Sequence, residues 1–327
     1  MSTQTQISPK TKIRHFLDLR DLDSATLRAI IDVGRAVKAM QDGRRVPMHP
    51  AHPLAGRTLG LMLSKPSTRT RLSFEVGMRQ LGGDVSVLSP ADMQIGRGES
   101  LADTARVLSR FLDVLVVRTG ETDMLPELVR WSSIPVVNGL TPDSHPVQIL
   151  ADIMTYEEHR GPVAGSHWAW IGDGNNVATS LIEGAVRFGF SLTLATPESM
   201  KPRQDVLDWA QAEGGKIRLV HDPVEAVRDA GCIVTDTWTS MSDKESAARL
   251  NTLRPFQVNA ALMQKASAEA LFMHCLPAHI GEEVTEDVFE SAASVVFDEA
   301  ENRLHAQKGL LLWVLGSEEW RSFGTPG

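Results

Sequence analysis

Residues 59–88 read LGLMLSKPSTRTRLSFEVGMRQLGGDVSVL, and their pattern indicates the architecture of the chain. Its first five residues, 59–63, form an apolar run that is typical of a buried strand. Residues 67–81 have the apolar spacing of a helix that ends at Gly82-Gly83, and residues 85–88 predict a second strand. A strand, a helix and a strand in this order favour two parallel strands joined by a right-handed crossover.

The same alternation of short apolar runs and amphipathic segments continues along the chain. A helix capped by Asp23 or Ser24 comes first and ends near Gly43. The order predicts an α/β protein with two doubly wound, largely parallel sheets. Further strands are expected at 114–117, 134–137, 168–171, 192–195, 217–220, 232–235, 271–274 and 295–297, and further helices at 100–109, 125–131, 146–159, 176–188, 206–212 and 224–230.

A chain of 327 residues has the length of two domains. The Gly- and Pro-rich segment Arg160–Ser166 follows the long helix of 146–159 and marks the change from one domain to the next. We expect a first domain over residues 1–150 and a second over residues 151–300, with the active site in the cleft between them. A last helix, which begins near Glu301, could return to either domain.

Composition excludes several classes of protein. With 42% hydrophobic and 23% charged residues the chain is typical of a folded soluble protein. A net charge of −8 provides no general basic field for a nucleic acid, and no apolar run approaches the length of a membrane span. The polar residues 1–12 lack the apolar stretch of a signal peptide, and only Cys232 and Cys275 are present. We therefore expect a protein of the reducing cytoplasm, without a disulfide framework.

Donor side chains gather between the first predicted strand and its helix, at Ser67-Thr68-Arg69-Thr70-Arg71. Free backbone N–H groups and the positive end of the helix dipole favour an anion at such a point, and hydroxyl and guanidinium groups add directed donors. The alternative is a capped helix start with a solvated basic turn. The segment lacks the Gly-rich turn of a P-loop.

Two further polar groups follow predicted strands. Arg118 comes directly after the strand at 114–117, and His145 begins the long helix in the segment His145-Pro146-Val147-Gln148. An Arg and a His that face one cleft could polarise a carbonyl oxygen as negative charge develops on it. Taken alone, each of these residues is more typical of a structural role.

The ends of two later strands carry a thiol and a carboxylate. Cys275 follows His274, but neighbouring residues of a strand point to opposite faces, so His274 is badly placed to activate the thiol. Cys275 is better interpreted as a contact residue or as a small buried hydrophobe than as a nucleophile. Asp236 could hold a cationic amine, or it could form a turn. Gly172-Asp173-Gly174 suggests a dinucleotide site only weakly, because Val177 stands at the third glycine position.

Taken together, three of these motifs resemble the aspartate/ornithine carbamoyltransferase family. They are Ser67-Thr68-Arg69-Thr70-Arg71, His145-Pro146-Val147-Gln148 and His274-Cys275-Leu276-Pro277, in this order and spacing. Cys rather than Pro after His274, and Asp236 followed by Ser240-Met241, are similar to the members that act on ornithine. The likeness runs from about Phe16 through Leu315 and includes residues 99–106 and 299–303.

The resemblance implies transfer of the carbamoyl group of carbamoyl phosphate to the side-chain amine of L-ornithine, which gives L-citrulline and phosphate. It implies trimers or multiples of trimers with shared sites, no metal and no organic cofactor, and a C-terminal helix of about 301–327 that packs back on the first domain. Arg118, His145, Cys275 and Arg303 are implied to be catalytic. Carbamoyl phosphate is implied to be bound by Ser67, Thr68, Arg69, Thr70, Arg118, His145, Gln148, Cys275, Leu276 and Arg303, and by Gln94 of a neighbouring subunit, and ornithine by Asn176, Asp236, Ser240 and Met241.

Three other functions are compatible with parts of the pattern. One is a carbamoyltransferase for another amine or amino acid, and a second is a non-catalytic relative that only binds carbamoyl phosphate. A dehydrogenase is the third, and the missing glycine fingerprint argues against it. Leu63-Ser64, Ser242 and Ile280 depart from the usual pattern of the family, but none of them is a residue to which chemistry is assigned.

Overall fold

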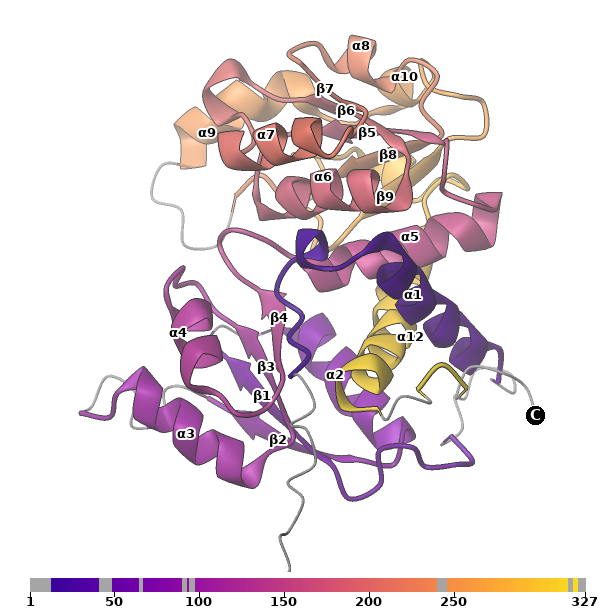
Figure 1. Cartoon of the computed structure of the whole chain (residues 1–327). Helices are drawn as coiled ribbons and strands as arrows, with labels where there is room; N and C mark the ends of the chain where they lie inside the picture. The colour runs from indigo at the N-terminus through magenta and orange to yellow at the C-terminus, as the bar shows by residue number, and fades with distance from the viewer. Residues whose placement is uncertain are drawn as a thin grey trace, which may run out of the picture.

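The computed structural model describes residues 13–40, 49–64, 67–89, 93, 98–239, 246–316 and 320–322. It contains two parallel sheets, one above the other in Figure 1, and each is covered by helices. The α/β class with two largely parallel sheets, which the sequence predicts, is therefore confirmed. Among the described residues no helix is both long and apolar enough to cross a membrane.

The first sheet has the strand order β2-β1-β3-β4, with every pair parallel. From β1 the chain goes first to β2 on one side and then to β3 on the other, so the connections change direction between β1 and β3. Ligands bind at the carboxyl end of such a switch point in open α/β sheets. The elements are β1 (Thr58–Leu63), α2 (Thr68–Gln80), β2 (Asp84–Leu88), α3 (Leu101–Phe111), β3 (Val114–Arg118), α4 (Met124–Trp131) and β4 (Val136–Leu140).

The second sheet repeats this plan with the order β7-β6-β5-β8-β9, again all parallel. Its switch point lies between β5 and β8, because β6 and β7 extend one side and β8 and β9 the other. The elements are β5 (His167–Ile171), α6 (Asn176–Phe188), β6 (Ser191–Ala195), α7 (Gln204–Ala212), β7 (Ile217–Val220), α8 (Pro223–Val227), β8 (Cys232–Thr235), α9 (Ser246–Leu253), α10 (Ala260–Met263), β9 (Leu271–His274) and α11 (Glu286–Phe289).

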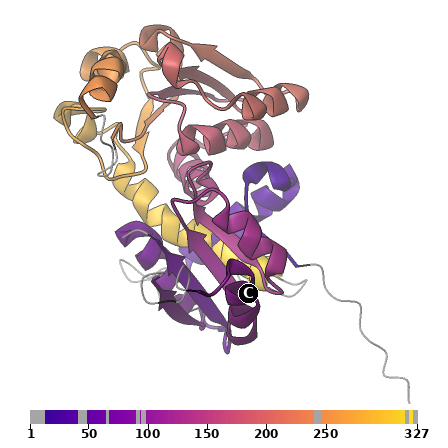
Figure 2. The same ribbon diagram turned by 90° about the vertical axis from the view of Figure 1, so that its left-hand side faces the viewer.

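Two long helices join the halves. Helix α5 (Pro146–Arg160) lies between the two sheets and runs without a break across position 150. Helix α12 (Val296–Leu315) descends from the second sheet into the first half, where it packs on α2, α5 and α1 (Ser24–Ala39) (Figure 2). The largest apolar core accordingly contains side chains from both halves. The last helix, expected over about 301–327, thus begins at Val296 and ends at Leu315.

Helices α1 and α12 cross with their backbones in contact. A Cβ atom on Gly309 would meet the carbonyl oxygen of Ile30 and the backbone nitrogen of Gly34. A Cβ atom on Gly34 would lie 2.7 Å from the carbonyl oxygen of His305. Only glycine permits this approach, so this pair of glycines fixes the position of α12 along its length.

The strand expected at Val295–Phe297 is wrong. Val295 caps α12, and Val296 and Phe297 form its first turn. The apolar, β-branched residues suggested a strand, but Asp298 and Glu299 follow at once and favour the positive end of a helix dipole. Just before α12, Ser294 forms an isolated parallel bridge with Phe272 of β9.

Candidate active site

The motif Ser67-Thr68-Arg69-Thr70-Arg71 begins helix α2 at the switch point of the first sheet. Ser67 caps the helix, and its hydroxyl accepts a hydrogen bond from the Thr70 N–H at 3.4 Å. Arg118 is the last residue of β3, and its Nη1 donates to the Thr70 hydroxyl at 2.9 Å. The N-terminus of a helix and a guanidinium group are thus held together at the edge where an anion is expected.

Three guanidinium groups converge at this edge. Burial, followed by Arg118 and Arg69, lowers the pKa of Arg303 to about 10. Burial also lowers the pKa of Arg118, which Arg69 lowers as well and the Cys275 and Asp236 groups raise. Among the described residues, Nε and Nη2 of Arg303 have no hydrogen-bond partner. Buried donors of like charge without an acceptor are the signature of an anion site.

His145 lies beside the same three arginines. It caps α5, where Pro146 takes the first helical position, and its backbone N–H donates to the Ser180 hydroxyl at 2.8 Å. Burial, followed by Arg303, Arg118 and Arg69, lowers the pKa of its imidazole well below the ordinary value. The ring is therefore neutral near pH 7, and it can donate one N–H to an oxyanion without changing its charge.

Gln148 connects the arginines to two buried acids. Its Oε1 accepts a hydrogen bond from Arg303 Nη1 at 2.6 Å. Its Nε2 donates to Asp152 Oδ1 and to Glu299 Oε1, both at 2.8 Å. Glu299 Oε2 in turn accepts the backbone N–H of His274 at 2.8 Å, which connects α12 to the end of β9.

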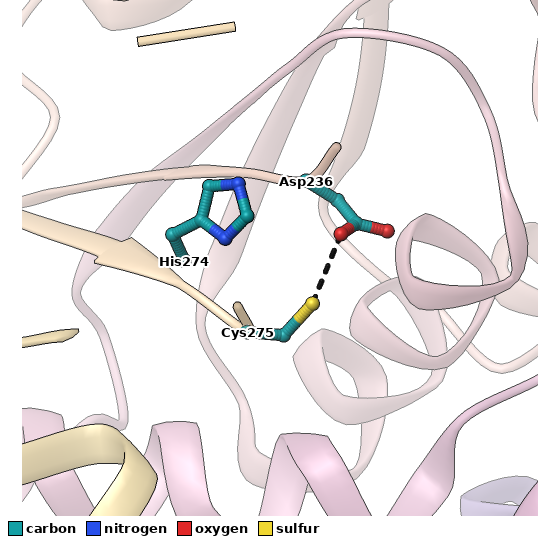
Figure 3. Close-up of side chains that lie close together, drawn as sticks. All are labelled: Asp236, His274 and Cys275. Atoms are coloured by element: carbon teal, nitrogen blue, oxygen red, sulfur yellow. Dashed lines mark hydrogen bonds between the residues drawn. The ribbon is translucent and has the colours of Figure 1, made fainter. Parts of the chain in front are cut away.

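Asp236 and Cys275 lie at the ends of β8 and β9, on the second sheet. Figure 3 shows the Cys275 thiol directed at Asp236, to whose Oδ1 it donates at 3.0 Å. The other carboxylate oxygen of Asp236 accepts Asn175 Nδ2 at 2.7 Å. Burial and then Asp236 raise the pKa of Cys275 well above that of a free thiol, so the sulfur stays protonated. This state excludes an activated nucleophile, in agreement with the interpretation of Cys275 as a contact residue.

The polar atoms beside this thiol could suggest a metal. Ligand atoms of Asp236, His274 and Cys275 lie within 4.8 Å of one another, as do those of His279, Glu282 and Glu283. However, His274 Nδ1 accepts the Leu276 N–H at 2.8 Å and its Nε2 bonds to Glu283 Oε1 at 3.1 Å. Both ring nitrogens are thus occupied, which favours a structural hydrogen-bond network over a metal site.

Leu276 has an unusual backbone. Its φ of 59° lies in the left-handed region, which residues with a bulky side chain rarely adopt. The hydrogen bond from its N–H to His274 Nδ1 helps to hold this conformation. Backbone strain of this kind is concentrated at functional sites, and here it directly follows Cys275 in the chain.

The structure brings most of the predicted site residues together. Asn176 is directed differently: its Nδ2 donates to the Thr141 carbonyl at 2.8 Å, and its neighbour Asn175 contacts Asp236 instead. Gln94, Ser240 and Met241 lie outside the described residues. Thr68 is exposed on the first turn of α2.

Sequence reasoning missed several groups that organise the site. Asp152 and Glu299 are two of them, and each stands four residues from a predicted site residue on one helix, Gln148 or Arg303. That spacing was the available signal, because residues i and i+4 share a helix face. Arg249 is a third: it donates to Asp173 and to the Trp238 carbonyl, which ties α9 to the ends of β5 and β8. Burial raises the pKa of Asp173 to about 6 despite the contact with Arg249.

Comparison with known proteins relates most of the chain to one family of enzymes. Residues 14–158 match the family model of the aspartate/ornithine carbamoyltransferase carbamoyl-P binding domain, and residues 164–314 that of the Asp/Orn binding domain. Ornithine carbamoyltransferase of Nitrobacter winogradskyi is 56% identical over 304 residues, which cover 93% of this chain and 98% of that one. The Rhizobium johnstonii enzyme of the same name is 54% identical and covers 95% and 100%.

A solved structure shows that the similarity extends to the fold. Ornithine carbamoyltransferase from Pyrococcus furiosus superposes with a TM-score of 0.88 at 45% identity, over 93% of this chain and 97% of that chain. The two domain models, the two relatives and the Pyrococcus furiosus structure all indicate the same family. The chain belongs to the aspartate/ornithine carbamoyltransferase family.

Proposed function

We propose that this protein transfers the carbamoyl group of carbamoyl phosphate to the side-chain amine of L-ornithine, which yields L-citrulline and phosphate. Membership of the family supports the reaction class, and the relatives above carry the name of the ornithine enzyme. The observation that carries the proposal is Arg303, whose buried Nε and Nη2 face no acceptor among the described residues while Arg69 and Arg118 stand nearby. A phosphorylated, doubly anionic substrate supplies the missing acceptors.

The substrates divide between the two switch points. Carbamoyl phosphate is bound chiefly at the first switch point and by α5 and α12, through Ser67, Thr68, Arg69, Thr70, Arg118, His145, Gln148 and Arg303. Cys275 and Leu276 add contacts from the end of β9 of the second sheet, and Gln94 adds one from a neighbouring subunit. Ornithine is bound on the second sheet, by Asn176, Asp236, Ser240 and Met241. Asp236 supports this division, because its carboxylate pairs with the α-ammonium group of an amino acid but not with a phosphate. We accordingly assign carbamoyl phosphate to residues 1–150 and ornithine to residues 151–300.

The reaction proceeds by direct attack. The deprotonated δ-amine of ornithine forms a bond to the carbonyl carbon of carbamoyl phosphate, and negative charge moves to the carbonyl oxygen. Arg118 and the neutral His145 ring stabilise this oxyanion. The intermediate collapses with cleavage of the carbon–oxygen bond to phosphate, which leaves with Arg69, Arg303 and the start of α2 around it. The amine proton passes to the departing phosphate, and no side chain is acylated.

We also propose a cytoplasmic homotrimer, or a multiple of trimers. Both cysteines are unpaired, which suits a reducing compartment. Leu72, on α2, and Val107 and Phe111, on α3, expose apolar side chains that a neighbouring subunit would cover. A closed ring would also bring Gln94 of one subunit to the site of the next.

Initial rates with a panel of acceptors test the proposed reaction. Carbamoyl phosphate is supplied with ornithine, N-acetylornithine, putrescine or aspartate, and phosphate and the carbamoylated product are both measured. Ornithine should give the highest kcat/KM, with one phosphate released per citrulline formed. A higher value for another acceptor would change the substrate assignment. Binding of carbamoyl phosphate without turnover of any acceptor would identify a non-catalytic member.

Mixed refolding tests the shared site. Gln94→Ala and Arg303→Ala are each shown to be inactive, then unfolded and refolded together. If sites are shared between chains, some reassembled sites carry neither lesion, so activity returns in the mixture. Mixed trimers that are identified by mass but remain inactive would place all catalytic groups within one chain.

A further inference from the structure

The side-chain amide of Gln148 can be oriented in two ways, and its neighbours permit only one. Its NH2 group faces two carboxyl groups, of Asp152 and Glu299, at 2.8 Å each. Its carbonyl oxygen faces a guanidinium N–H of Arg303 at 2.6 Å. The reversed amide would set oxygen against both carboxyl groups and NH2 against the guanidinium, so every contact would become repulsive.

The two carboxyl groups that cause this preference are buried and adjacent. Asp152 and Glu299 each expose only 1% of their surface, and a side-chain hydrogen bond joins them. Two carboxyl groups in this relation hold one proton between them, because two buried negative charges in contact repel strongly. Burial and then Asp152 raise the pKa of Glu299 well above its ordinary value, and burial raises that of Asp152 to about 7.

The surroundings of the pair come from three elements. Arg303 faces it from the next turn of α12, Cys232 from β8, and Asp236 from the end of β8. Cys275 faces it from the end of β9. Arg303 is the cation among these groups, and Gln148 lies between it and the acids. The pair therefore acts on the site through the Gln148 amide.

We propose that Asp152 and Glu299 are positioning residues that orient the Gln148 amide, so that its carbonyl oxygen accepts a hydrogen bond from the amino group of carbamoyl phosphate. The inference rests on the proposed function, in which Gln148 contacts that substrate. A carbonyl oxygen has two lone pairs, so Gln148 Oε1 can serve Arg303 and the substrate together. An acyl phosphate with a methyl group in place of the amino group cannot use this contact, so the pair also contributes to substrate specificity.

The test compares two substitutions with the same heavy-atom skeleton. Asp152→Leu removes the acceptor, whereas Asp152→Asn retains a carbonyl oxygen for Gln148. The affinity for carbamoyl phosphate and the inhibition constant of acetyl phosphate, which carries a methyl group instead, are measured for both. Asp152→Leu should weaken the binding of carbamoyl phosphate at least about fivefold, as expected for one lost hydrogen bond. It should change the inhibition constant of acetyl phosphate less than about twofold. Asp152→Asn should restore most of the affinity for carbamoyl phosphate.

A Gln148→Ala background separates the two levels of the proposal. There the Leu and Asn variants should have the same affinity, because the amide that Asp152 orients is gone. Two results would overturn the positioning role. One is that Asp152→Leu weakens the binding of carbamoyl phosphate and of acetyl phosphate equally. The other is that Asp152→Leu and Asp152→Asn still differ as much in affinity for carbamoyl phosphate when Gln148 is Ala. If Gln148→Ala alone leaves carbamoyl phosphate binding unchanged, the assignment of Gln148 to the substrate fails instead.

Glu299→Gln provides a second route, which does not depend on the folding of Asp152→Leu. Its carbonyl oxygen still accepts the His274 N–H, but its NH2 group faces the NH2 group of Gln148 and favours the reversed amide. The affinity of Glu299→Gln for carbamoyl phosphate should fall about threefold, and its affinity for acetyl phosphate should not change. In the Gln148→Ala background, Glu299→Gln should have no effect on either. A Glu299→Gln variant that keeps the parent's preference for carbamoyl over acetyl phosphate would contradict the proposal.

Discussion

The two switch points differ in how many hydrogen-bond partners their charged side chains already have within the protein. At the first, Arg69 makes no side-chain hydrogen bond to any described residue, and Arg303 uses only one of its three nitrogens. At the second, Asp236 already accepts hydrogen bonds from Asn175, Cys275 and Thr237. The comparison shows one region that stores electrostatic repulsion until an anion arrives, and another in which the ligand joins a completed network. The first region should therefore contribute binding energy at little cost to stability, and the second should couple binding to structure.

Arg69→Ala should produce the largest effect. The lost charge-assisted contact corresponds to at least about 2 kcal/mol, or roughly thirtyfold weaker binding of carbamoyl phosphate. Because Arg69 lowers the pKa of both Arg118 and Arg303, its removal relieves repulsion, and the melting temperature should stay the same or rise. Arg79→Ala, further along α2, removes an exposed partner of Glu75 and serves as the control. Calorimetric titration and thermal unfolding of both variants check this, and a marked fall in melting temperature for Arg69→Ala would contradict the stored repulsion.

Asp236→Asn should act on the other substrate. It removes the charge proposed to pair with the α-ammonium group of ornithine, so the KM for ornithine should rise about tenfold or more. The KM for carbamoyl phosphate should change less than about threefold. Asp222→Asn, which keeps a capping side chain at the start of α8, is a matched control in the same half of the molecule. Equal increases in both KM values would show that Asp236 shapes the fold instead.

Cys275→Ser should have a moderate effect. The serine hydroxyl can also donate to Asp236 Oδ1, so kcat/KM should fall by less than about tenfold. Cys275→Ala removes the donor and should cost more, by one further hydrogen bond or roughly fivefold. Steady-state kinetics of the pair measure this order. A loss of about a thousandfold in the serine variant would instead indicate a nucleophilic thiol.

The smallest effect concerns His145 and stability at low pH. Its folded-state pKa lies well below the unfolded value of 6.5, so below that pH the unfolded chain binds a proton that the native protein does not. This residue therefore contributes stability that is present above pH 6.5 and is lost as the pH falls, by up to about 1.4 kcal/mol per pH unit. Urea unfolding of the parent and of His145→Gln at pH 7 and pH 5.5 should show a smaller loss in the variant. Parallel losses would mean that the imidazole titrates normally in the folded protein.

Much of the fold could be predicted from local pattern. The apolar run at 59–63 and the helix that ends at Gly82-Gly83 appear as β1 and α2, because a buried parallel strand must be apolar on both faces. The strand predicted at Val295–Phe297 was wrong, because a run of three apolar residues is equally compatible with a strand and with the first turn of a buried helix. The short helices α9, α10 and α11 carry too few turns for a periodic signal.

The site could be predicted where its residues form compact motifs, and not where they meet only through the fold. Ser67, Arg69 and Thr70 are neighbours in sequence, so one motif reveals them. Gln148 and Glu299 are 151 positions apart, and their contact depends on the packing of α5 against α12. Asn175 and Asn176 differ by one position, and only the start of α6 determines which of them turns toward Asp236.

The crossing of α1 and α12 at Gly34 and Gly309 has a consequence for biosynthesis. The first domain receives its last core helix from the end of the chain, after the entire second domain has been made. During translation, α1 and the strands of the first sheet therefore emerge from the ribosome long before α12, the helix that covers them, is synthesised. Buried residues such as Ile30, Ile31 and Phe74 must wait for Leu310 and Leu311, so the nascent first half exposes apolar surface during most of its synthesis. The second domain is therefore the part that can complete its folding first, and the N-terminal half is the part whose exposed apolar surface is prone to aggregation until α12 is made.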